Sequence, residues 1–262
     1  MNASVDEQNK YVYAFDCTLI FVVAVLIRLL AFRIDPAVSR DGVRYLQMAK
    51  ELAALGPVGF YRDDPLNWIP PLYLHLVAWG IRAGFDAGTF AVGINVLFGS
   101  LTAVAAYWIG EAITKERLGA IAGGCIVIFA PLMVKLSYEC QRESIFLFCS
   151  ALCLYFTCLL CKGKFCGAYG AVAAAVTACF FRFEGLALVA GSFLVMTGCI
   201  IVAWRQKKFR TIELGHLAAC VIVAILLFEI ARRCMQLPET FFSRQFFRLT
   251  CRWHDICRML SW

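Results

Sequence analysis

Long apolar runs separated by short polar connections dominate the chain. Every backbone polar group in hydrocarbon must be bonded within its own segment, so a spanning helix needs about 20 apolar residues. The runs lie at 15–34, 70–84, 91–113, 118–136, 143–161, 166–181, 184–204 and 215–231. The run 70–84 opens with Pro70-Pro71 and is too short to span comfortably. The pattern predicts an all-α, polytopic transmembrane helix bundle of about seven spans.

The one substantial hydrophilic loop, residues 35–69, contains a predicted amphipathic helix. Ser39 is a suitable N-cap, and Gly56-Pro57 stops a helix. Apolar residues recur at helical spacing between them, at Tyr45, Met48, Leu52 and Leu55. We expect residues 39–55 to form a helix that lies on the membrane surface.

The C-terminal segment, residues 232–262, shows a second amphipathic pattern. Its apolar residues follow a spacing of three and four, at Phe242, Phe246, Leu249, Trp253, Ile256 and Leu260, with arginines mostly off that stripe. This favours an interfacial tail after a transmembrane domain of residues 1–231. A helix that packs against a partner protein fits the pattern equally well.

Composition supports the membrane assignment and narrows the chemistry. The chain is 61% hydrophobic and 16% charged, against about 25% charged in soluble domains. Its net charge of +7 suits lipid headgroups and cytoplasmic loops rather than a nucleic-acid partner. Most cysteines lie in apolar runs, and Cys158-x-x-Cys161 has no second pair nearby, so it predicts no metal site.

Loop charges predict the topology. If 70–84 does not cross and the N-terminus is inside, the cytoplasmic loops hold Lys115, Arg117, Lys162, Lys164, Arg205, Lys207, Lys208 and Arg210. The later outside connections then hold only Arg82, Lys135, Arg142 and Arg182. This arrangement obeys the positive-inside rule, and the alternative with 70–84 crossing violates it. The arginine-rich tail argues the opposite way, but we weigh the short loops above it.

This topology brings four ionisable residues to the same extracytoplasmic surface: Asp41, Glu143, Arg182 and Glu184. Arg182 and Glu184 interrupt the apolar stretch 168–203, where ionisable groups are expensive and usually functional. Structural explanations stay open for each residue. Asp41 can stabilise a helix N-terminus, Glu143 can anchor a helix at the interface, and Arg182 with Glu184 can form a loop ion pair.

Several short motifs follow one another in a familiar order. They are Ser39-Arg-Asp41-Gly-Val-Arg44-Tyr45, Pro70-Pro71-Leu-Tyr73, Gly110 to Gly119, Pro131 to Ser137, Arg142-Glu143 and Arg182-Phe-Glu184-Gly185. This series resembles the GT-C glycosyltransferases, above all the dolichyl-phosphate-mannose protein mannosyltransferases and the bacterial lipid A aminoarabinose transferases. It covers residues 15–204, and the ordered series is more specific than any single motif.

The resemblance implies an enzyme that moves a sugar from a polyprenyl-phosphate donor to an extracytoplasmic lipid, glycan or protein, with inversion. Asp41 matches the acidic residue of the first extracytoplasmic loop, the expected catalytic base. Glu143, Arg182 and Glu184 match positions that face the same cavity. The leaving phosphate needs cationic donors, for which Arg44, Arg142 and Arg182 are candidates, and Tyr45 is grouped with these substrate-binding residues. In a bacterium, the protein is expected in the cytoplasmic membrane.

The chain also departs from the family pattern. Gly42 replaces a second acidic residue, and Trp68-Ile69 stands where relatives often carry His or Glu. A divalent-metal site is therefore doubtful, and no cofactor is firmly implied. The chain also ends at Trp262, before the further helices of such enzymes. Two alternatives stay open: a non-catalytic subunit that acts with a partner subunit, and a small lipid transporter.

Overall fold

The computed structural model describes residues 2–36, 38–63, 70–206 and 211–237, and every element in these ranges is helical. The elements are α1 (Asn2–Ile34), α2 (Arg40–Asp63), α3 (Leu72–Arg82), α4 (Ala87–Thr114), α5 (Arg117–Phe129), α6 (Pro131–Leu136), α7 (Glu143–Cys161), α8 (Cys166–Cys179), α9 (Gly185–Arg205) and α10 (Thr211–Cys234). The predicted all-α class is thus confirmed for the described part of the chain.

Four of the described helices are long and apolar enough to cross a membrane: residues Tyr11–Ile34 of α1, together with α4, α7 and α9. This is the composition of a membrane protein. The seven expected spans are not confirmed. Helices α5 and α8 are apolar but contain only 13 and 14 residues, short of the ~20 that a span needs. Helix α3 has 11 residues, in agreement with a run that does not cross.

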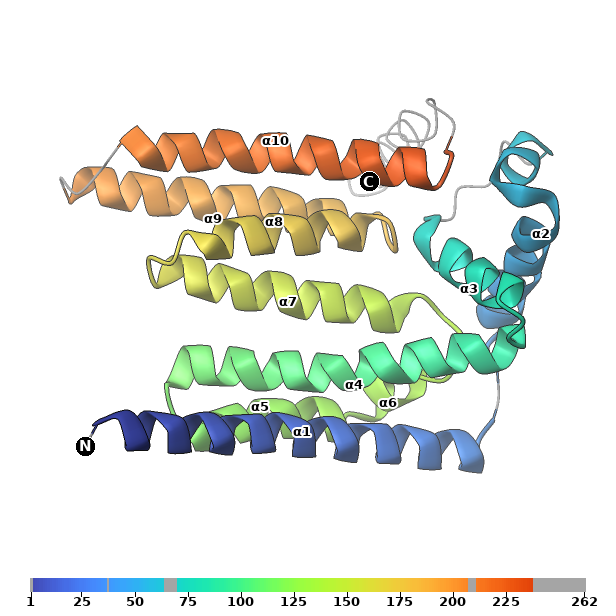
Figure 1. Cartoon of the computed structure of the whole chain (residues 1–262), viewed down its shortest axis with the longest axis horizontal. Helices are drawn as coiled ribbons and strands as arrows, with labels where there is room; N and C mark the ends of the chain where they lie inside the picture. The colour runs from blue at the N-terminus through green and yellow to red at the C-terminus, as the bar shows by residue number, and fades with distance from the viewer. Residues whose placement is uncertain (1, 37, 64–69, 207–210, 238–262) are drawn as a thin grey trace, which may run out of the picture.

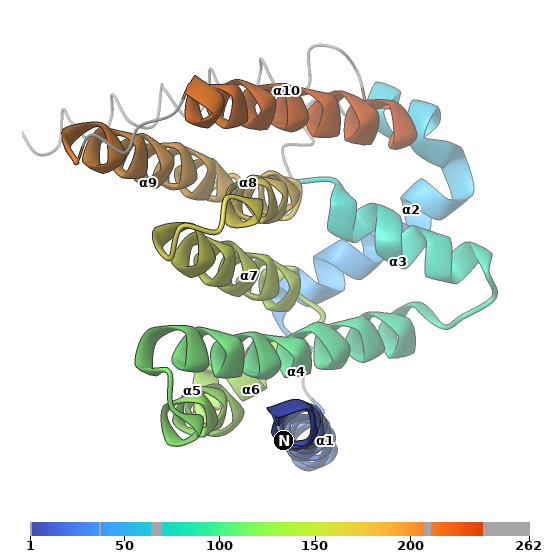
Figure 2. The same cartoon turned by 60° about the vertical axis from the view of Figure 1, so that its left-hand side comes forward.

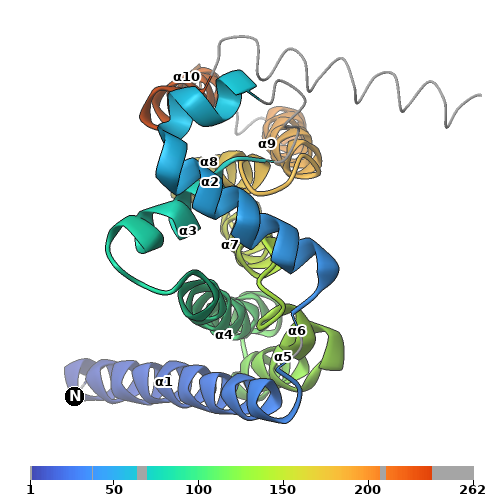
Figure 3. The same cartoon turned by 90° about the vertical axis from the view of Figure 1, so that its right-hand side faces the viewer.

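The long helices lie side by side with alternating direction (Figure 1). Helices α1, α5 and α6 lie on one side of the bundle and α9 and α10 on the other, with α4, α7 and α8 between them (Figure 2). Helices α2 and α3 lie at one end of the bundle, which we call the α2 end. Helix α2 runs across the ends of the long helices (Figure 3), the placement expected of a surface helix.

The short connections lie alternately at the two ends of the bundle, because consecutive long helices run in opposite directions. The N-terminus and the connections that carry Lys115, Arg117, Lys162 and Lys164 lie opposite the α2 end (Figure 1). The connections that carry Arg142 and Arg182 lie at the α2 end. Residues 207–210 lie outside the described residues, as do Trp68 and Ile69.

Helix α2 confirms the predicted 39–55 helix and extends it. The backbone N–H of Gly42 donates to Ser39 Oγ at 3.0 Å, so Ser39 is the expected N-cap. Gly56 leaves the helical conformation with φ 73° and ψ 167°, a region open essentially to glycine alone. The helix then restarts at Pro57 rather than stopping. Arg82 bonds the carbonyls freed at this break, with Nε 3.1 Å from the Ala53 oxygen.

The run 118–136, which we expected to be one segment, is divided. Helix α5 ends at Phe129 and α6 begins at Pro131. Ala130 between them is extended, with φ −67° and ψ 114°. A proline disfavours helical backbone at the preceding residue and has no N–H to donate, which explains the break.

The boundary of the C-terminal tail also shifts. Helix α10 continues to Cys234, so Arg232 and Arg233 belong to its last turn instead of opening a separate tail. Glu229 on the same helix accepts hydrogen bonds from both arginines, at 2.7 Å from Arg232 Nη2 and 2.6 Å from Arg233 Nε. The predicted interfacial helix from residue 238 onward lies outside the described residues.

Candidate functional site

A charged cluster at the α2 end joins α2 to the α6–α7 and α8–α9 connections. Arg182 lies at its centre. Its Nη1 donates to Glu143 Oε1 at 3.0 Å, and its Nη2 donates to Glu184 Oε1 at 2.7 Å. A third bond runs from Nε to Glu184 Oε2 at 3.2 Å, which makes the contact with Glu184 bidentate. The predicted proximity of Glu143, Arg182 and Glu184 is confirmed.

Arg142 lies beside this pair with unused hydrogen-bonding capacity. Its Nε is 3.9 Å from Glu143 Oε1, too far for a hydrogen bond, and its guanidinium lies 5.6 Å from the centre of the Tyr45 ring. Arg142 Nε and Nη1 and Glu143 Oε2 are buried with no partner among the described residues. Buried polar atoms are nearly always bonded, so these three atoms are available to a water molecule or to a ligand.

The three atoms without partners indicate which chemical groups a ligand could place here. The Arg142 nitrogens are charged donors, which suit an anionic oxygen such as that of a phosphate. Glu143 Oε2 is an acceptor, which suits a hydroxyl. Side-chain exposure rises from 13% at Arg142 through 29% at Arg182 to 61% at Glu184, so the cluster opens outward at Glu184.

Tyr45 of α2 lies next to the charged side chains of this cluster. Burial raises the pKa of its hydroxyl, and the charges of Arg142, Glu143, Asp41 and Arg182 all act on it. The ring of Tyr73 packs edge-on against it at 6.0 Å. Tyr45 therefore stays protonated at neutral pH and can donate a hydrogen bond.

The ion pair between Arg182 and Glu184 stabilises the charged form of both side chains. The hydrogen bond with Glu184 raises the pKa of Arg182, and the same bond lowers the pKa of Glu184. Both groups are thus charged at neutral pH. The contribution of Glu184 to stability is present above its ordinary pKa and is lost as pH falls through its lowered value.

The α6–α7 connection holds the start of α2 in place. Gln141 Nε2 donates to Ser39 Oγ at 2.6 Å, and Ser39 Oγ donates to the Glu139 carbonyl at 3.3 Å. A side chain at Gly42 would overlap that carbonyl oxygen. This close approach leaves no room for a side chain at position 42. Sequence reasoning missed Gln141, although it directly precedes Arg142-Glu143.

Asp41 and Arg44 lie outside the hydrogen-bonded cluster. Both are exposed on the first turns of α2. Asp41 is one helical turn before Tyr45, so the two share a face of α2. No hydrogen bond or ion pair joins Arg44 to the cluster within the described residues. Tyr45, Arg142, Glu143, Arg182 and Glu184 thus lie together, whereas Asp41 and Arg44 make no hydrogen bond or ion pair with them among the described residues.

Replacing Arg182 by glutamine is expected to destabilise the fold. The change leaves the carboxylates of Glu143 and Glu184 without their donors, at a cost of roughly 1–3 kcal/mol in the free energy of unfolding. Urea unfolding in detergent, followed by tryptophan fluorescence, measures this. Arg44→Gln removes the same charge without such bonds and is the control. Equal unfolding midpoints in the two variants would refute a structural role for the Arg182 pairs.

No metal-binding arrangement is visible here: in the described ranges, no three His, Cys, Asp or Glu side chains gather at metal-binding distance. No protein-family model, curated protein or solved structure matches the chain.

Proposed function

We propose that this protein is a GT-C-like membrane glycosyltransferase that moves a sugar from a polyprenyl-phosphate donor to an extracytoplasmic acceptor. One observation carries the proposal: among the described residues, two buried nitrogens of Arg142 and the neighbouring Oε2 of Glu143 have no partner. Charged donors next to an acceptor match a phosphate next to a sugar hydroxyl. Asp41 lies at the same end of the bundle, where a base is needed.

In this reaction the acceptor oxygen or nitrogen bonds to the anomeric carbon, and the bond from that carbon to the phosphate oxygen breaks. Asp41 takes the proton of the acceptor, and the polyprenyl phosphate leaves with the bonding electrons beside Arg142. Attack opposite the leaving group inverts the anomeric configuration. The bilayer contributes the binding energy of the lipid tail, so the protein supplies only the headgroup contacts.

The proposal includes the membrane arrangement. In this arrangement the chain crosses the membrane seven times: the four long apolar helices cross, and so do α5–α6, α8 and α10. It places the α2 end outside, facing the periplasm if the protein belongs to a bacterial cytoplasmic membrane. Lys115, Arg117, Lys162 and Lys164 in the short connections at the opposite end support this orientation through the positive-inside rule, whereas Arg40, Arg44 and Lys50 of α2 argue against it.

The test is transfer or hydrolysis by the full chain in liposomes, supplied with a panel of radiolabelled polyprenyl-phosphate hexoses and pentoses. Turnover of at least one donor, absent from empty liposomes, is the expected result. Donor binding without turnover would contradict an enzyme and favour a non-catalytic subunit. Neither binding nor turnover across the panel would refute the proposed donor class.

A further inference from the structure

Arg28 is a fully buried cation in the middle of an apolar helix. Its exposure is 0%, and it lies about 9 Å along α1 from Ile34. Its Nε donates to Ser137 Oγ at 2.9 Å and its Nη1 to the Ala24 carbonyl at 3.1 Å. Within the described ranges its buried Nη2 has no partner, and no carboxylate forms an ion pair with Arg28. The guanidinium therefore has neutral acceptors but no counter-charge.

An uncompensated charge in this position is costly. Removing a charged group from water into a low-dielectric interior costs several kcal/mol unless an opposite charge accompanies it. Arginines within apolar spans therefore usually pair with other charged groups or with backbone carbonyls, or face a water-filled cavity. By contrast, the other buried charged residue of α1, Asp16, accepts two hydrogen bonds from Arg117, at 2.7 and 2.8 Å. Arg28 is the exception on its helix.

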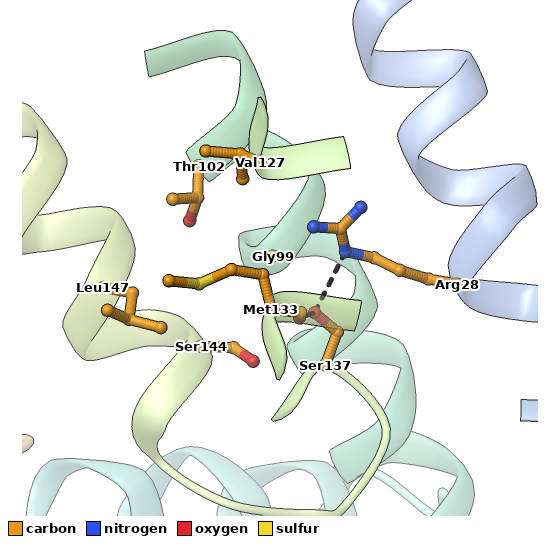
Figure 4. A pocket seen from close by; sticks show the side chains of 8 residues that line it. All are labelled: Arg28, Gly99, Thr102, Val127, Met133, Ser137, Ser144 and Leu147. Carbon is orange, nitrogen blue, oxygen red and sulfur yellow. Dashed lines mark hydrogen bonds between the residues drawn. The ribbon is translucent and has the colours of Figure 1, made fainter. Parts of the chain in front are cut away.

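Arg28 points into a cavity between α1, α4, α5, α6 and α7 (Figure 4). It leaves room for one ligand about the size of a water molecule. Hydroxyls of Thr102, Ser137 and Ser144 line it. Gly99 makes this approach possible, because a Cβ there would lie 2.9 Å from Arg28 Nε and would overlap Ser137 Oγ.

We propose that this cavity binds one monoatomic anion of the halide class, with Arg28 Nη2 as its charged ligand. A water molecule would accept the free N–H but would leave the charge uncompensated, whereas a halide satisfies both. The hydroxyls of Thr102 and Ser144 now donate to helix carbonyls, at 2.8 Å to Phe98 and 2.9 Å to Leu136. A hydroxyl rotates freely enough to donate to the anion instead.

The bound anion would link Arg28 of α1 to the α6–α7 connection, which carries residues of the candidate site. Ser137 and Ser144 flank the segment with Gln141, Arg142 and Glu143. Filling the cavity stabilises this connection whether or not the protein transfers a sugar. The anion site is thus independent of the proposed function.

The test compares thermal unfolding of the full chain in detergent in sodium chloride and in sodium gluconate at equal ionic strength. Gluconate is too large for the cavity. We expect the unfolding temperature to rise with the logarithm of chloride concentration, as single-site binding to the folded state requires. The rise should vanish in Arg28→Gln and persist in Arg33→Gln, which alters an exposed arginine of the same helix.

A crystal of the wild-type protein grown in bromide gives a second readout that needs no variant. Anomalous density next to Arg28 Nη2 supports the site even if Arg28→Gln fails to fold. Non-anomalous density in the cavity would show a water molecule and overturn the proposal. Equal salt responses of the wild type and a folded Arg28→Gln variant would also overturn it.

Discussion

Asparagine in place of Asp41 is expected to lower the rate of sugar transfer by roughly 10²- to 10⁴-fold, the usual contribution of a general base. Asparagine has nearly the same size but cannot take the proton of the acceptor. Asp41 is exposed and makes no ion pair with the described residues, so donor binding should survive. Single-turnover transfer and donor binding are measured on the same liposomes.

A purely structural role for Asp41 predicts a different outcome. A carboxylate in the first turn of α2 contributes about 0.3–1 kcal/mol through the helix dipole. Its loss would lower the unfolding midpoint slightly and leave the rate per folded molecule unchanged. Glu51→Gln removes an exposed carboxylate from the same helix and is the matched control. A rate equal to that of Glu51→Gln would exclude Asp41 as the base.

Glutamine in place of Arg142 is expected to weaken donor binding by roughly 10- to 100-fold. A charge-assisted hydrogen bond contributes about 1.5–3 kcal/mol, and about 1.4 kcal/mol corresponds to tenfold in affinity. Two nitrogens of Arg142 are buried and unpartnered among the described residues, so they are available to a phosphate. Equilibrium binding of a radiolabelled donor to reconstituted protein measures the effect.

Stability separates this variant from Arg182→Gln. Arg142 makes no hydrogen bond with a described residue: it contacts the Tyr45 ring, which contributes roughly 0.5–1 kcal/mol, and its Nε lies 3.9 Å from Glu143 Oε1. Its replacement should therefore change the free energy of unfolding little, while Arg182→Gln lowers it through three lost hydrogen bonds. A large loss of stability in Arg142→Gln with unchanged affinity would assign Arg142 to the fold instead of to the donor.

Apolar runs predicted most of the helices because segments buried in a membrane are almost always long apolar helices. The run 143–161 coincides with α7, and Ser39 caps α2 as its side-chain chemistry requires. The error in 118–136 came from weighing the apolar run above Ala130-Pro131, whose backbone preference was readable. Hydropathy alone does not decide whether α5 and α8, which have fewer than 15 residues each, cross the membrane.

The candidate site was only partly predictable. Arg182, Glu143 and Glu184 were expected at one surface because alternating helices return their connections to the same end. Contacts across long stretches of sequence were not visible: Gln141 bonds Ser39 from 102 positions away, and Arg28 meets Ser137 from 109 positions away. Such pairings depend on how helices pack laterally, which periodicity within one helix does not encode.

The most direct test of the phosphate site compares two lipids of equal length, a polyprenyl phosphate and the uncharged polyprenol, in equilibrium binding to the reconstituted protein. The wild type should bind the phosphate at least about tenfold more tightly, the value of one charge-assisted hydrogen bond. Arg142→Gln should lose most of this preference while binding polyprenol as before. Equal affinities of the wild type for both lipids, or a preference that survives in Arg142→Gln, would contradict a donor phosphate held by Arg142.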